Sequence, residues 1–169
     1  ISFYTNYFTL PIGDDVDGSA YGIELSTGTS TSLGVVVATV TAAGGNVTGE
    51  DDSSVTTEAD AYGVYARSSN LTTGPASLTV TAQGGMVNGS AKSAEASAYG
   101  MEVKSNNTLT IGGDLDVTVK AIGGTEAGTG KLQSADSNAS GIWNENSILN
   151  ETGALTGTVT AKSGTASLS

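Results

Sequence analysis

The chain has 169 residues, a formal net charge of −11, and neither cysteine nor histidine. Without those residues the chain lacks the usual general base, the thiol nucleophile and the nitrogen or sulfur metal ligands. The composition therefore predicts a protein that is not an enzyme and has no cofactor other than calcium. The acidic balance argues against nucleic-acid partners, and no segment predicts membrane insertion. Its 24 glycines, 24 threonines and 21 serines are typical of strands and turns.

The first ten residues differ from everything that follows. They hold four of the nine aromatic residues: Phe3, Tyr4, Tyr7 and Phe8. We interpret residues 1–18 either as a cap that covers the first repeat or as an assembly strand that packs on another copy. An isoleucine at position 1 favours a processed chain or an excerpt of a longer one.

Residues 13–18 carry an acidic turn with the sequence Gly-Asp-Asp-Val-Asp-Gly. Asp14, Asp15 and Asp17 resemble the first part of a calcium loop, because carboxylate oxygens are the ligands that calcium prefers. The downstream acidic ligand is absent, since Ser26 stands at the expected spacing. A solvated polar turn is the alternative interpretation.

Two short sequence marks recur through residues 19–169. The first is Ala-Tyr-Gly at 20–22, 61–63 and 98–100, with Ala-Ser-Gly at 139–141. The second is Val-Thr-Ala at 40–42, 80–82 and 159–161, with Val-Lys-Ala at 119–121. Residue types that stay in phase over a period of about forty residues predict a stacked repeat architecture.

Within the third repeat, residues 96–103, 108–111 and 115–121 alternate apolar and polar side chains between turn residues, and a polar arc follows. Alternation of this kind predicts strands, so we expect an all-β fold: a parallel β-helix, or β-solenoid, of about four repeats. Leucines would form one apolar row (Leu71, Leu109, Leu149) and valines another (Val40, Val80, Val119, Val159). The marks also fall at half the period, so a coil of about twenty residues stays open. We favour forty because like residues then stack on like.

Two further patterns have both a functional and an ordinary explanation. Six N-glycosylation sequons begin at Asn46, Asn70, Asn88, Asn106, Asn138 and Asn150; chance and the preference of asparagine for turns also account for them. Thr-Val-Thr recurs in phase and would suit an ice-binding array, but Lys120 interrupts it and threonine is common in strands.

The repeats resemble those of a known family. Ser19-Ala20-Tyr21-Gly22-Ile23, Asn107-Thr108-Leu109-Thr110-Ile111, Asp116-Val117-Thr118-Val119 and Gly84-Gly85 are similar to repeats of secreted bacterial β-solenoid adhesins of the autotransporter-passenger type. The resemblance spans about residues 19–161. It implies a right-handed parallel β-helix, a cell-surface location and a structural or adhesive role.

We therefore expect an extracellular or cell-surface, non-enzymatic β-solenoid that joins head to tail into a fibre or forms part of a longer surface protein. Its expected partners are further copies of itself, joined head to tail, and surface glycans. The alternative is a module that binds carbohydrate or a calcium-dependent ligand, with Tyr62, Tyr65, Tyr99 and Trp143 stacking on sugar rings.

Overall fold

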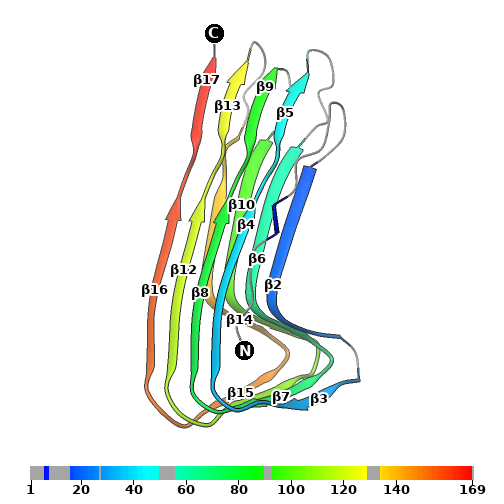
Figure 1. Cartoon of the computed structure of the whole chain (residues 1–169), viewed down its shortest axis with the longest axis vertical. Helices are drawn as coiled ribbons and strands as arrows, with labels where there is room; N and C mark the ends of the chain where they lie inside the picture. Colours follow the sequence, from blue (N-terminus) through cyan, green and yellow to red (C-terminus); the bar gives the residue numbers. More distant parts are fainter. Residues whose placement is uncertain are drawn as a thin grey trace.

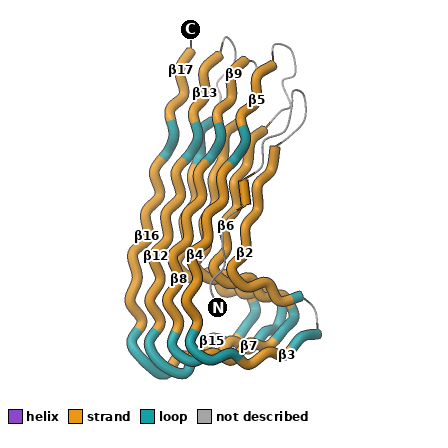
Figure 2. The backbone as a smooth tube through the Cα atoms, in the orientation of Figure 1, coloured by secondary structure: helices purple, strands orange, loops and turns teal. Residues whose placement is uncertain are grey.

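A computed structural model describes residues 6–7, 16–26, 28–49, 56–89, 93–128 and 134–168. Within these ranges there are strands, turns and no helix. The strands form parallel sheets that run along a stack of coils, as Figures 1 and 2 show. The predicted all-β, parallel β-solenoid is confirmed, with four rungs that amount to about three full turns.

Each rung contributes one strand to each of four sheets, and a short strand β1 (Asn6–Tyr7) precedes them. Sheet B contains β2 (Val16–Leu25), β6 (Thr56–Arg67), β10 (Ser93–Lys104) and β14 (Ser137–Glu145). Sheet C contains β3 (Ser30–Ser32), β7 (Asn70–Thr73), β11 (Thr108–Ile111) and β15 (Ile148–Glu151). Sheet A contains β4 (Val36–Ala43), β8 (Ala76–Gln83), β12 (Leu115–Ile122) and β16 (Leu155–Lys162), with β1 at its edge. Sheet D contains β5 (Asn46–Gly49), β9 (Met86–Gly89), β13 (Thr125–Gly128) and β17 (Thr165–Leu168).

Like residues stack directly on like, which confirms the forty-residue coil. The valine row pairs as predicted through Val40, Val80, Val119 and Val159. The leucine row pairs through Leu71, Leu109 and Leu149. In a parallel sheet the side chains of one row point to the same side of the sheet, so a repeat in phase puts every apolar row into the core at once.

The core is thin because its residues are small. In β8 every second side chain is buried, from Ala76 through Leu78 and Val80 to Ala82. The largest fully buried side chains include Leu71, Met101, Leu109, Ile111 and Leu115. Each strand is too short to bury this surface alone, so burial depends on the rungs above and below.

The fourth strand of each rung is a correction to the sequence analysis, which expected a polar arc after the double glycine. The strands β5, β9 and β13 of sheet D begin at the residue directly after that pair and are paired in parallel. Short runs such as Thr-Glu-Ala-Gly at 125–128 show no apolar alternation. Their structure comes from backbone hydrogen bonds to the adjacent rungs, which no local pattern signals.

The start of the chain is described only at β1. Asn6 and Tyr7 pair in parallel with Ala42 and Ala43 of β4, in the first rung of the same chain. The predicted assembly residues Phe3, Tyr4 and Phe8 lie outside the described residues, and the side chain of Tyr7 is not described. The choice between cap and assembly strand stays a prediction, although the described part of the segment lies on its own first rung.

Sheet B bends sharply (Figures 1 and 2), and its burial alternation breaks at the glycine of the Ala-Tyr-Gly mark, since Gly63 and Val64 are both buried. Its strands descend beside sheet A and then turn away from it toward sheet C, so the outer face lies on the inside of the bend (Figures 1 and 2). A Cβ atom on Gly63 would lie 2.5 Å from the carbonyl oxygen of Gly100 and 3.0 Å from Cγ2 of Val80. Only glycine fits where the sheets and rungs approach so closely.

We expect Gly63→Ala to lower the free energy of unfolding by about 1–3 kcal/mol, because the added methyl group overpacks the bend. Gly34→Ala is the matched control, since a Cβ at Gly34 has no atom within 4 Å. Urea unfolding followed by circular dichroism measures both. Equal midpoints for the two variants would show that the bend does not depend on close approach.

Candidate functional site: the aromatic elbow

The bend of sheet B gathers aromatic side chains on its outer face. Five residues, which we call the aromatic elbow, contact one another there: Tyr21, Tyr62, Tyr65, Tyr99 and Trp143. They come from β2, β6, β10 and β14, and register places them together although they are up to 122 positions apart (143 − 21). The tyrosine that marks the first three repeats in the sequence therefore forms a row in space.

Three of the tyrosines form a stack along the solenoid. The ring centroids of Tyr21 and Tyr62 are 5.0 Å apart, and those of Tyr62 and Tyr99 are 5.2 Å apart. The paired rings are tilted by only 6° and 7°. Both faces of Tyr62 are thus covered by tyrosine rings, so this side chain stabilises the stack and has no free face for a sugar.

A second row of the elbow lies beyond the glycine bend. Tyr65 packs at 66° to Tyr62 and at 64° to Tyr21, with centroid distances of 5.4 and 5.7 Å. Trp143 takes the same position in the last rung and lies at 88° to Tyr99, with a centroid distance of 6.4 Å. Edge-to-face contacts of this kind add to the stability of stacked rings.

The tyrosine stack ends in the fourth rung. The residue paired with Tyr99 there is Ser140, the degenerate position of the repeat mark. The elbow therefore lacks a ring at a place where each preceding rung has one. Trp143 stands beside this place and is 45% exposed.

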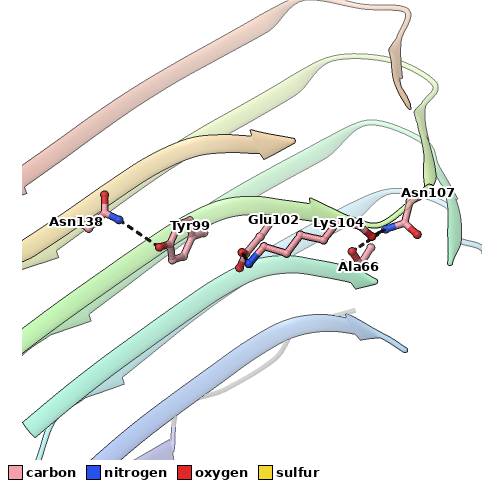
Figure 3. A network of polar contacts seen from close by, with 6 residues as sticks. All are labelled: Ala66, Tyr99, Glu102, Lys104, Asn107 and Asn138. Carbon is pink, nitrogen blue, oxygen red and sulfur yellow. Dashed lines mark hydrogen bonds and ion pairs between the residues drawn. The ribbon is translucent and has the colours of Figure 1, made fainter. Parts of the chain in front are cut away.

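Polar groups border the same part of the elbow. The Asn138 amide donates a hydrogen bond of 3.2 Å to the hydroxyl oxygen of Tyr99, and Lys104 forms an ion pair with the buried carboxylate of Glu102 (Figure 3). Glu102 occupies the row position of Tyr65 and Trp143. Glu24 holds the same position in the first rung, so glutamate and aromatic residues alternate along this row. The sequence analysis missed the ion pair of Glu102 and Lys104, and this in-phase alternation was the available signal.

Burial makes the three stacked tyrosines weaker acids than a free tyrosine. Desolvation raises the pKa of Tyr21, Tyr62 and Tyr99, and nearby carboxylates such as Asp60 and Glu102 raise the pKa of Tyr62 further. Desolvation is also the main cause for Tyr99, and the carboxylates of Glu102 and Asp60 raise the pKa of Tyr99 further. The stacked phenols therefore stay neutral, and available as hydrogen-bonding groups, well into the alkaline range.

A buried asparagine holds the next corner together. Nδ2 of Asn107 donates to the carbonyl oxygens of Ala66, at 2.7 Å, and Lys104, at 2.8 Å (Figure 3). Its Oδ1 accepts from the backbone N–H of Ser69. Ser147 takes the equivalent position in the last rung. The side chain satisfies backbone groups that a tight turn leaves unpaired, so its role is structural.

The predicted calcium site cannot be built from the described residues. Asp14 and Asp15 lie outside them, and only the backbone of Asp17 is described, at the start of β2. Across the described ranges, no group of three or more acidic side chains is arranged to hold a metal ion. Calcium binding therefore stays a prediction that rests on the sequence.

The sequon asparagines occupy different environments. Oδ1 of Asn46 and of Asn70 accepts the backbone N–H of the paired residue in the next rung. Asn106 is exposed in a turn with a φ of 61°, and Asn150 is exposed in β15. Asn138 bonds Tyr99, and the side chain of Asn88 is not described. A contact along the stack thus explains three of these asparagines without glycosylation.

The threonines of sheet A face outward, as strand alternation requires. One row is unbroken and exposed: Thr39, Thr79, Thr118 and Thr158. Lys120 interrupts the neighbouring row between Thr81 and Thr160. The single complete row is ordinary for an exposed strand face, and ice binding stays a prediction.

The chain matches no protein-family model, and comparisons with curated proteins and with solved structures found nothing significantly similar. In the part of the chain that is described, no helix is long and apolar enough to cross a membrane. The fold and the elbow are therefore the observations on which a function has to rest.

We expect alkaline titration to separate the tyrosines. An unfolded tyrosine ionises near pH ~10, whereas the stacked ones ionise later, so above that pH the folded state binds more protons than the unfolded state. The stacked tyrosines therefore leave the free energy of unfolding unchanged below pH ~10 and lower it as the pH rises above that value. Absorbance at 295 nm, compared with urea unfolding over the same range, measures both effects. Ionisation of all six tyrosines near pH ~10 in the folded protein would contradict the stack.

Proposed function

We propose that this chain is a non-enzymatic structural module of an extracellular or cell-surface β-solenoid, which continues rung by rung in a fibre or in a longer surface protein. The supporting observation is the open face of the fourth rung. There Ile148, Leu155 and Val159 are 58%, 57% and 50% exposed. The paired residues Leu115 and Val119 of the third rung are fully buried.

A glycine in the fourth rung supports continuation on the side of the elbow. In the first two rungs, a Cβ on the bend glycine would lie 2.5–2.6 Å from a glycine oxygen of the following rung. At Gly141 the nearest atom to such a Cβ is Cγ2 of Val159, at 3.3 Å. Contacts within this chain therefore barely require a glycine at position 141. A further backbone lying against Gly141 would require one.

The corner between sheets A and D is less suited to an identical rung. Gly44, Gly84 and Gly123 each lie so close to the next rung that a Cβ would be 2.5–2.6 Å from a backbone nitrogen. Ser163 takes this position in the fourth rung, and β1 occupies the edge of the first rung at the corresponding corner. We therefore propose that a covering rung follows sheets A, B and C and diverges at this corner.

We expect Val159→Lys to reduce concentration-dependent association, because it puts a charge into the apolar row of the open face. Thr158→Lys is the matched control, since it adds the same charge one residue away on the outward face. Sedimentation velocity of the whole chain over a range of concentrations measures both. The open face has no role in assembly if the unmodified chain stays monomeric at every concentration and both variants have the same urea-unfolding midpoint as that chain.

A second function, glycan adhesion, is favoured by one observation. The tyrosine stack stops at Tyr99, and the position above it combines an exposed indole with an amide and no covering ring. Aromatic rings beside hydrogen-bonding groups suit the apolar face and the hydroxyl groups of a sugar. This function does not conflict with the first, because the elbow is on the side of the solenoid and the stacking faces are at its ends.

A further inference from the structure

We propose that the vacant ring position outside Ser140 binds one neutral pyranose ring of an oligosaccharide. This inference deepens the adhesive part of the proposed function and rests on it. Tyr62 lies on Tyr21, and Tyr99 lies on Tyr62, with nearly parallel rings at each step. Ser140 follows Tyr99 in register but carries no ring, so the outer face of Tyr99 is not stacked.

The position has two aromatic walls. Tyr99 supplies a ring face at its base, and Trp143 stands at 88° to that ring on one side, with a centroid distance of 6.4 Å. Trp143 is exposed although it lies in the concave bend. A flat ring of about the thickness of a tyrosine continues the spacing of the stack, which suits a pyranose that lays its C–H face on Tyr99.

The polar groups around the position suit sugar hydroxyls. The Asn138 amide uses one N–H on the Tyr99 hydroxyl, which leaves a second N–H and a carbonyl oxygen with capacity for further hydrogen bonds. On the Trp143 side lies the ion pair of Glu102 and Lys104. Amide and phenol groups at the border of an apolar surface orient a ligand through directed hydrogen bonds.

Charge selects a neutral sugar. Lys104 lies beside the position, and the Glu102 carboxylate neutralises its charge. The chain as a whole carries a net charge of −11, so a uronic acid meets repulsion. The Glu102 carboxylate is buried and already paired with Lys104, so it is not available to a cationic sugar.

The chain has a built-in probe for this site, because Trp143 is its only tryptophan. Titration of the whole chain with neutral cello-, xylo-, manno- and galacto-oligosaccharides, with emission excited at 295 nm, reports on this position alone. We expect a saturable blue shift with at least one neutral series. Polygalacturonate and chitosan oligomers serve as the acidic and cationic controls and should give no saturable shift.

Two variants test the geometry. Ser140→Tyr should fill the position with the missing ring, raise the urea midpoint and abolish the shift, so loss of binding cannot be attributed to misfolding. Trp143→Ala should weaken binding about tenfold or more, measured by saturation-transfer NMR because the fluorophore is gone. Val37→Ala is the control, since it removes an exposed apolar side chain from sheet A, outside the elbow, and should leave sugar affinity unchanged.

Several outcomes would overturn the proposal. They are the absence of any saturable shift with neutral sugars, equal binding by Ser140→Tyr and the unmodified chain, and a preference for the charged sugars. A shift of Trp143 emission with protein concentration alone would show that a second copy fills the position. Val159→Lys should change association and not sugar binding, so failure of the sugar site and failure of the structural function are told apart.

Discussion

The constraint on which this structure depends is parallel, in-register pairing between successive coils. Because each residue lies on its counterpart about forty positions away, a row can hold only side chains that suit one environment. Apolar rows such as Val40 to Val159 fill the core, and small residues fill the places where sheets approach. Because the repeats stay in register to the residue, a chain with nine aromatic residues and no cysteine forms a continuous core.

The same constraint turns a repeated tyrosine into a surface. One Tyr in each of three rungs becomes a stack of rings, and the glycine that follows it lets the sheet bend around that stack. A substitution in a single rung then has a local meaning. Ser140 interrupts the stack. In the neighbouring row Glu102 stands between Tyr65 and Trp143 and pairs with Lys104. Such departures from the repeat, rather than the repeat itself, are where a solenoid carries specificity.

Sequence periodicity was enough to predict the rows of the core, because Leu71, Leu109 and Leu149 keep both type and spacing. It did not predict sheet D, whose strands lack alternation and depend on the pairing of neighbouring rungs. It also did not predict that the tyrosines pack on one another, since the bend that brings Tyr65 against Tyr62 depends on how closely Gly63 approaches sheet A. The partners of Asn107 lie in turns whose conformation, with Asn106 at a φ of 61°, has no regular signal.

The measurement that tests the coil register most directly is the distance between two spin labels on the outer face of sheet A. Thr79 and Thr118 are exposed and directly paired, so labels at these positions are attached to backbones about 5 Å apart. The chain has no native cysteine to interfere with labelling. A forty-residue coil predicts strong dipolar broadening of the doubly labelled protein relative to each single label. Weak broadening, with strong coupling instead between positions about twenty residues apart, would contradict the register on which the elbow and its proposed site depend.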